Sequence, residues 1–217
     1  PYLTFHAYDP GYQVTFALML TSAIITCALT TRQKDHAKMS AQAAFRTKIL
    51  FDTNQLLQRA KSEEEILSQT ASQLMKLLNR SLIVYPEQNG DLGSEQFFGV
   101  DGETAQNIFS APEERDAANW TFANKKRSGA GTDSYPDAKG LYLALRTGGG
   151  VFGVIGIDLS EKPLDAFENS VLLSILGEGA LAIENRRNAL EKEQAALQAR
   201  NEELRANLLR TISHDLR

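Results

Sequence analysis

The stretch GLYLALRTGGGVFGVIGIDL, residues 140–159, is the clearest indication of the fold of this chain. Leu141, Leu143 and Leu145 alternate with other residues, which is typical of a strand with one buried face. Three glycines interrupt this alternation, and a second segment rich in valine and isoleucine follows them. Two apolar strands joined by a glycine turn predict a β-hairpin, so the sheet around it should be antiparallel.

Strands and helices are also predicted on both sides of the hairpin. RSLIVYPEQNG (residues 80–90) and EQFFGV (residues 95–100) are rich in β-branched and aromatic residues, so each predicts a short strand. Apolar residues recur at helical spacing before the first of these strands and after the hairpin. Residues 45–185 therefore predict an α+β domain in which helices pack on an antiparallel sheet.

Helix-start signals locate the predicted helices. Ser62 and Glu65 form the pattern of a capping box, in which each side chain accepts a hydrogen bond from a free backbone N–H of the other's turn. Ser110 is an N-cap candidate for a helix that has Pro112 in its first turn. A last helix begins near Pro163 and carries a stripe of apolar residues along one face.

The predicted domain shows no cofactor motif and no active-site motif. The glycines at 148–150 lead into a strand rather than a helix, and SGAGTDSYP lacks the lysine of a phosphate-binding loop, so both stretches are interpreted as turns. Residues 45–185 contain neither histidine nor cysteine, which argues against ligated haem, thioether-linked bilin and zinc. Four aromatic residues could line the pocket of a non-covalent ligand: Trp120, Phe122, Tyr135 and Tyr142. Aromatic side chains are more often part of a core, so no cofactor-binding or metal-binding residue is assigned.

Residues 12–30, YQVTFALMLTSAIITCALT, form an uncharged apolar stretch. As a helix they would reach roughly 28 Å, close to the roughly 30 Å of a bilayer's hydrocarbon core, so we expect a membrane helix, with a buried core helix as the alternative. The basic segment TRQKDHAK follows, and positive charge marks the cytoplasmic side. We therefore expect residues 1–31 to end a membrane region, residues 32–44 to form a juxtamembrane linker, and everything after residue 31 to be cytoplasmic.

Composition limits the classes of function. The formal net charge is -4 at pH 7, which gives no reason to expect a nucleic-acid partner. Cys27 is the single cysteine, so neither a disulfide nor a multi-cysteine metal site can form within one chain. The sequence starts at Pro1 without a methionine, so we expect it to be part of a longer protein.

The C-terminal region has the pattern of a coiled coil, with neither glycine nor proline in residues 186–217. The heptad positions of its seam are Ile183, Leu190, Leu197 and Leu204. This seam predicts a homodimer, and Gln194 and Asn201 at the companion positions leave it incompletely packed, so it should tolerate shifts in register. Arg187 and Glu191, four residues apart, predict a weak pair that supports the helix.

The last residues, LLRTISHDLR, place a histidine on a helix surface. Leu208, Ile212 and Leu216 continue the apolar stripe at a spacing of four residues. His214 lies about 200° around the helix from Ile212 and Leu216, so its imidazole should be accessible to solvent, as a nucleophile must be. Asp215 is the adjacent carboxylate that could polarise the ring.

SHDLR resembles the H box of sensor histidine kinases, Ser-His-Asp/Glu-Leu-Arg-Thr-Pro, which carries the phosphoacceptor histidine. The segment that runs from AANWTF to GVIGIDL, residues 117–159, resembles the GAF-type domain of Kdp-type potassium-limitation sensor kinases. DPGYQVTFALMLTSAIITCALTTRQK is similar to the last membrane helix of that family, and the segments follow in the family's order.

The resemblance implies a two-component sensor kinase of the inner membrane that responds to potassium limitation or osmotic stress. It implies a GAF-type domain over residues 45–185, then a signalling coiled coil that runs into a truncated phosphoacceptor helix over residues 186–217. His214 would be autophosphorylated with ATP, Asp215 would activate the imidazole, and the phosphoryl group would pass to a response regulator. ATP and Mg2+ would bind a separate catalytic domain, so this part alone should be inactive. The alternative is a GAF-type small-molecule receptor or dimerisation module with another output, in which His214 has no role.

Overall fold

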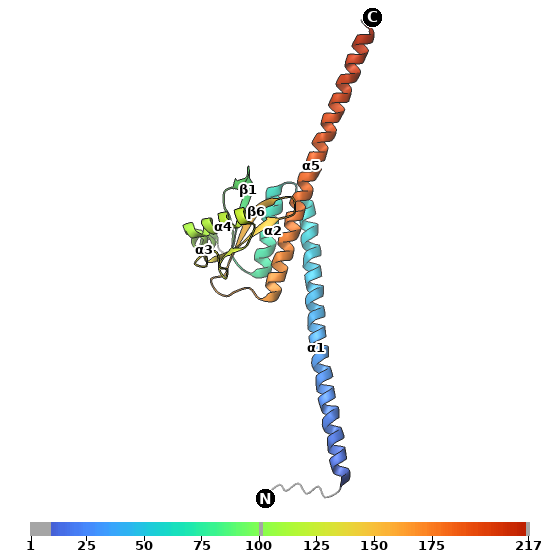
Figure 1. Ribbon diagram of the computed structural model, residues 1–217, viewed down its shortest axis with the longest axis vertical. Helices are drawn as coiled ribbons and strands as arrows, with labels where there is room; N and C mark the ends of the chain where they lie inside the picture. Colours follow the sequence, from blue (N-terminus) through green and yellow to red (C-terminus); the bar gives the residue numbers. More distant parts are fainter. Residues whose placement is uncertain (1–9, 100–101, 216–217) are drawn as a thin grey trace. The chain divides into compact units, whose positions relative to one another are not determined.

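The computed structural model describes residues 10–99 and 102–215 of the chain. The chain divides into two units, Pro1–Ile49 and Leu50–Arg217. The described part of the first unit belongs to one helix, α1, which spans Pro10–Arg59 and so continues into the second unit (Figure 1). Residues 32–44, the expected juxtamembrane linker, are part of this helix, and they contain neither glycine nor proline to interrupt its backbone hydrogen bonds.

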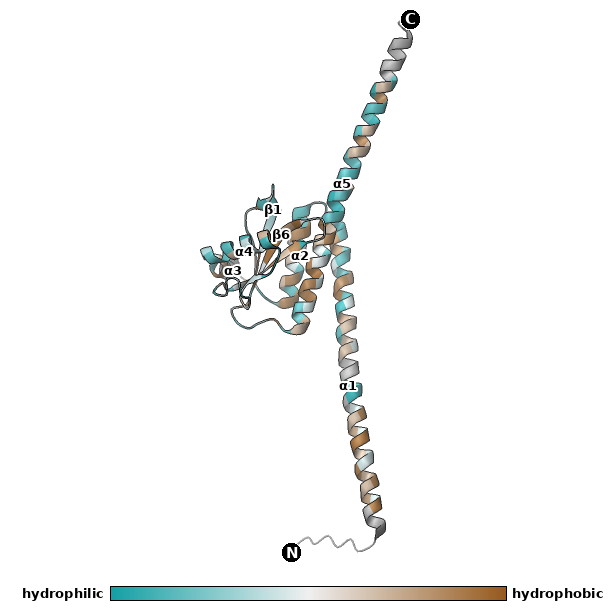
Figure 2. Cartoon of the chain, viewed as in Figure 1, coloured by the Kyte–Doolittle hydropathy of each residue, from teal (hydrophilic) through white to brown (hydrophobic). Residues whose placement is uncertain are grey.

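The N-terminal half of α1 exposes a run of apolar side chains (Figure 2). By length and composition the helix over Val14–Arg59 is a candidate membrane span, and none of its apolar window is buried. A second candidate, Ala166–Asn207, is partly buried in the domain, as a core helix is. The hydroxyls of Thr21, Thr26 and Thr30 donate to helix carbonyls four residues earlier, at 2.7 to 3.0 Å. These bonds satisfy the polar groups that make the stretch less apolar than an ordinary span.

Six strands form the antiparallel sheet of the second unit. The strands are β1 (Leu82–Gln88), β2 (Asp91–Leu92), β3 (Gln96–Phe98), β4 (Ser128–Gly129), β5 (Gly140–Arg146) and β6 (Val151–Asp158). Their order is β2-β1-β6-β5-β4, and β3 also pairs with β1. The predicted hairpin is confirmed, since β5 pairs with β6 in a register that places Leu141 opposite Ile157 and Leu145 opposite Gly153.

Helices cover both faces of this sheet, which confirms the α+β class (Figure 1). The helices of this unit are α2 (Glu63–Leu78), α3 (Gly102–Phe109), α4 (Pro112–Asn124) and α5 (Ala166–Asp215). On one face α2 packs beside the N-terminal part of α5, where Leu172 and Ile175 are fully buried. On the other face Tyr85, Tyr142 and Val154 form a buried cluster with the alanines of α4.

The predicted helix starts are only partly correct. The Ser62 hydroxyl accepts a hydrogen bond from the backbone N–H of Glu65 at 3.1 Å, as expected. The Glu65 carboxylate, however, accepts from the backbone N–H of Lys61 at 2.7 Å rather than from that of Ser62. The assignment of Ser110 as an N-cap is wrong, because α4 begins after Ala111. The Ser110 hydroxyl instead donates to a carbonyl in the last turn of α3, a helix that the sequence analysis did not predict.

Tyr85 makes the stability of the domain depend on pH. Burial raises the pKa of Tyr85 to about 12, although Arg115, 4.9 Å from the ring centroid, acts in the opposite direction. The pKa of tyrosine in the unfolded chain is about 10, so the unfolded state loses this proton first as the pH rises. Below roughly pH 10 the buried Tyr85 hydroxyl makes its full contribution to the free energy of unfolding. Above roughly pH 10 this contribution should fall by about 1.4 kcal/mol per pH unit.

Urea titrations of the chain and of Tyr85→Phe, followed by the fluorescence of the single tryptophan, Trp120, measure this slope. The variant should lose stability less steeply between pH 10 and the pKa of about 12. Equal slopes in the two proteins would show that Tyr85 is not the titrating group.

Candidate functional site

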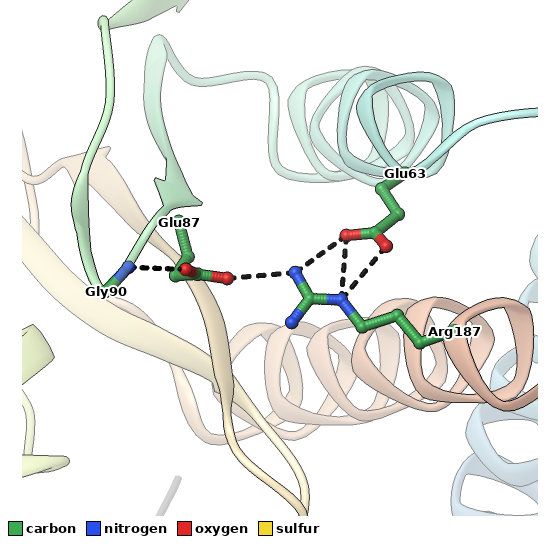
Figure 3. Close-up of polar contacts among 4 residues, drawn as sticks. All are labelled: Glu63, Glu87, Gly90 and Arg187. Carbon is green, nitrogen blue, oxygen red and sulfur yellow. Dashed lines mark hydrogen bonds and ion pairs between the residues drawn. The ribbon is translucent and has the colours of Figure 1, made fainter. Parts of the chain in front are cut away.

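Arg187 joins α2 and β1 to α5 at the point where α5 leaves the domain (Figure 3). Its guanidinium Nε donates to both carboxylate oxygens of Glu63, the first residue of α2, at 2.9 and 3.0 Å. Its Nη2 donates to Glu63 at 2.8 Å and to Glu87, near the end of β1, at 2.9 Å. We name Glu63, Glu87 and Arg187 the α5 junction.

Neighbouring groups fix the geometry of the α5 junction. The second oxygen of Glu87 accepts from the backbone N–H of Gly90 at 2.9 Å, in the β1–β2 turn (Figure 3). This hydrogen bond lowers the pKa of Glu87 against the opposing effect of burial, and Arg187 lowers it further. The bonds to Glu63 raise the pKa of Arg187 above its ordinary value. The guanidinium also lies 5.0 Å from the centroid of the Phe152 ring, so β6 contacts the junction as well.

Further side chains bond the same part of α5 to the rest of the domain. The bonds are Asn54 to Glu178 at 3.0 Å, Thr147 to Glu184 at 2.9 Å, and Arg186 to the carbonyl of Lys61 at 2.8 Å. Their partners lie at the end of α1, in the β5–β6 turn and in the α1–α2 loop. A displacement of any of these segments would therefore act directly on α5 just before it leaves the domain.

Replacing Arg187 by alanine should destabilise the domain by about 1–2 kcal/mol, because Glu63 and Glu87 would lose their charged hydrogen-bond donor. The effect stays moderate because the side chains of Arg187 and Glu63 are 37% and 33% exposed, so solvent screens the pair. Urea unfolding measures the loss. Arg200→Ala, on the exposed part of α5, is the matched control and should change little. An unchanged Arg187→Ala protein would mean that the junction does not hold α5.

Beyond the α5 junction, α5 exposes the leucines of the predicted seam. Leu190, Leu197 and Leu204 are 39%, 57% and 55% exposed. The assignment of Ile183 to the seam is wrong, because Ile183 is fully buried in the domain. Arg187 pairs with Glu63 and Glu87 rather than with Glu191 along its own helix, and Glu63 offers bidentate geometry. The exposed stripe therefore begins at Leu190.

The backbone of His214 and Asp215 forms the end of α5, and their side chains lie outside the described residues. The roles of phosphoacceptor and activating carboxylate therefore stay predictions. α5 is one unbroken helix from Ala166, so it links the buried core of the domain to His214 without a turn. Within residues 10–99 and 102–215, no cluster of histidine, cysteine, aspartate and glutamate has the geometry of a metal site.

The four aromatic candidates have different environments. Tyr142 is fully buried and donates to Glu114 at 2.7 Å, and Phe122 packs against the same buried cluster, so both are core residues as expected. Trp120 is half-buried and lines an open cleft, and Tyr135 is exposed. The interpretation as core is therefore wrong for Trp120 and Tyr135.

The sequence analysis did not identify the α5 junction. Glu63 and Glu87 lie 124 and 100 residues before Arg187, and no local pattern relates positions so far apart. The position of Arg187 in the sequence could have indicated the junction. It lies one helical turn after Ile183, the last buried residue of the apolar stripe. A basic residue at the end of a buried stripe is a candidate for bonding the helix to its domain.

No family model matches the chain. Over its whole length the chain is 33% identical to the sensor protein KdpD of Clostridium acetobutylicum. Over 96% of its length it is 27% identical to the sensor protein KdpD of Escherichia coli K12. The chain spans about a quarter of the length of these curated relatives, 24% and 23%.

The domain is also similar to solved GAF domains. A GAF domain from Pseudomonas syringae pv. tomato superposes with a TM-score of 0.50 at 19% identity, covering 73% of this chain and 97% of that one, which shows the fold. The GAF domain of the potassium sensor histidine kinase KdpD from Escherichia coli superposes with a TM-score of 0.47 at 20% identity and covers 70% and 99%. The chain is similar to a segment of the KdpD sensor proteins, and its folded core has the fold of a GAF domain.

Proposed function

We propose that this chain is the sensory and signal-relay part of a two-component sensor histidine kinase that responds to potassium limitation or osmotic stress. The observation that carries the proposal is the continuity of α5, because the helix that packs in the GAF core also contains His214. A displacement at the α5 junction would be passed along a rigid helix toward His214. The likeness to two sensor proteins named KdpD supports the same role.

The proposed chemistry is phosphoryl transfer to His214. An imidazole nitrogen attacks the γ-phosphoryl group of ATP, so that an N–P bond forms, the bond to the departing ADP oxygen breaks, and the ring loses its N–H proton. Asp215 orients the imidazole and favours its nucleophilic form. A separate catalytic domain of the parent protein binds ATP and Mg2+, and a response regulator accepts the phosphoryl group on an aspartate.

The proposal includes a homodimer and a membrane anchor. The stripe of Leu190, Leu197 and Leu204 is exposed at heptad spacing, and pairing with a second copy would bury it. The exposed apolar half of α1 would span the inner membrane. The basic residues that follow it favour a topology in which everything after residue 31 is cytoplasmic.

Phosphorylation in trans tests the proposed function. The chain is incubated with a separately produced ATP-binding domain of a KdpD-type sensor protein, labelled ATP and Mg2+. We expect an acid-labile, base-stable phosphate on the chain, which is the chemical signature of a phosphoramidate. If neither this chain nor the full-length parent protein takes up label, the small-molecule receptor with another output becomes the better description.

A further inference from the structure

An open cleft lies at the β5 edge of the sheet, apart from the α5 junction. It has a volume of about 1000 Å³. Its walls come from the segment that follows α4, from β5, and from the first turns of α5. On this edge β4 pairs only with Leu141 and Tyr142 of β5. No described strand pairs with the rest of β5 on that side.

Positive charge dominates the rim of this cleft. Four basic side chains line it: Lys125, Lys126, Arg127 and Arg146. All are exposed, and none forms an ion pair with another described residue. Among the described lining residues the one carboxylate is Asp133. Unpaired cations gathered around one concavity, in a chain of net charge -4, create a local field that attracts anions.

The segment that carries three of these cations is held at both ends. Lys125 adopts the left-handed conformation at the end of α4, and its N–H donates to the carbonyl of Thr121 at 2.9 Å. Ser128 is buried and bonds to the Thr121 hydroxyl at 2.7 Å and to the Ala117 carbonyl at 2.8 Å. The backbone that carries these cations is therefore fixed at both ends before any ligand arrives, which lowers the entropic cost of binding.

Four apolar side chains also line the cleft. They are Leu143 of β5, Leu173 and Leu176 of α5, and the half-buried Trp120 of α4. A lining that combines cations with apolar side chains fits a small molecule that combines anionic groups with a less polar body. Guanidinium and ammonium groups bind phosphate oxygens through charge-assisted hydrogen bonds, and several such groups favour more than one phosphate.

We propose that this cleft binds a small soluble molecule that carries two or more phosphate groups. The site is concave and partly lined by apolar residues, which suits a molecule that enters it better than the flat surface of a bilayer. Because Leu173 and Leu176 belong to the helix that contains Arg187, an occupied cleft contacts the element that leaves the domain. The binding step itself does not depend on the proposed kinase activity.

The test is isothermal titration calorimetry of the 217-residue chain in detergent micelles with inorganic tripolyphosphate as the probe. We expect saturable binding of one anion per chain. Arg127→Gln and Arg146→Gln should each weaken binding by about tenfold, since each removes a charge-assisted hydrogen-bond donor. Lys192→Gln removes the same charge from the exposed part of α5 and should change the affinity less than about twofold. His214→Ala should bind as the original chain does, which separates this test from that of the kinase.

Three results would overturn the proposal. One is a calorimetric titration with tripolyphosphate in which binding does not reach saturation. Another is equal weakening by Lys192→Gln and Arg127→Gln, which would indicate attraction to net charge alone. The third is loss of tripolyphosphate binding when phosphatidylglycerol, but not uncharged phosphatidylcholine, is mixed into the micelles, which would assign the basic side chains to a lipid surface. Circular dichroism of each variant verifies that the fold is intact.

Discussion

His214→Ala is expected to abolish phosphorylation of this chain. Alanine has no nitrogen that can attack the γ-phosphoryl group, so no phosphoramidate can form. The substitution lies at the end of α5, beyond the buried part of the domain, so the fold should be unaffected. The measurement is acid-labile label after incubation with the separate ATP-binding domain, ATP and Mg2+, repeated in the full-length parent protein.

His36→Ala is the matched control, because it removes an imidazole from another helical position and should leave the label unchanged. Asp215→Asn should slow labelling by roughly 10-fold or more without abolishing it, since the asparagine keeps the shape of the side chain but loses the charge that favours the nucleophilic ring. Label that persists in His214→Ala would place the phosphoacceptor elsewhere and remove the central residue of the proposed function.

Replacing Glu114 by alanine should cost about 3–5 kcal/mol of unfolding free energy. Glu114 lies on α4, is only 1% exposed, and accepts three hydrogen bonds. They come from the N–H of Lys139 at 2.7 Å, the N–H of Gly140 at 3.1 Å and the hydroxyl of Tyr142 at 2.7 Å. Alanine would leave these donors without an acceptor, two of them where β5 begins.

Urea unfolding, followed by Trp120 fluorescence, measures this loss. Glu113→Ala is the matched control, because the neighbouring carboxylate is exposed and its removal should change the stability by less than about 0.5 kcal/mol. The pKa of Tyr142 is raised by burial and then by Glu114, so the tyrosinate absorbance of Glu114→Ala should also develop at a lower pH. A loss below about 1 kcal/mol would mean that water replaces the carboxylate.

The sequence alone predicted the features that depend on near neighbours in the chain. Alternation and the glycine turn in residues 140–159 predicted the β5–β6 hairpin, and helical spacing predicted the α2 and α5 stripes. The α+β class followed from these local patterns. The motif SHDLR predicted that His214 is the phosphoacceptor, and it could be found in the sequence because it is a short run of consecutive residues.

Other features depend on contacts between distant parts of the chain. The sequence placed Ile183 both on the apolar stripe of the last domain helix and in a coiled-coil seam, and only the packed domain shows that it is fully buried. It predicted a pair within the helix for Arg187, whose partners Glu63 and Glu87 lie 124 and 100 residues away. It also gave no sign that Glu114 is a buried acceptor for β5, 26 residues further on at Gly140. Periodicity indicates which face of an element is buried, whereas only the packed fold determines which polar groups meet there.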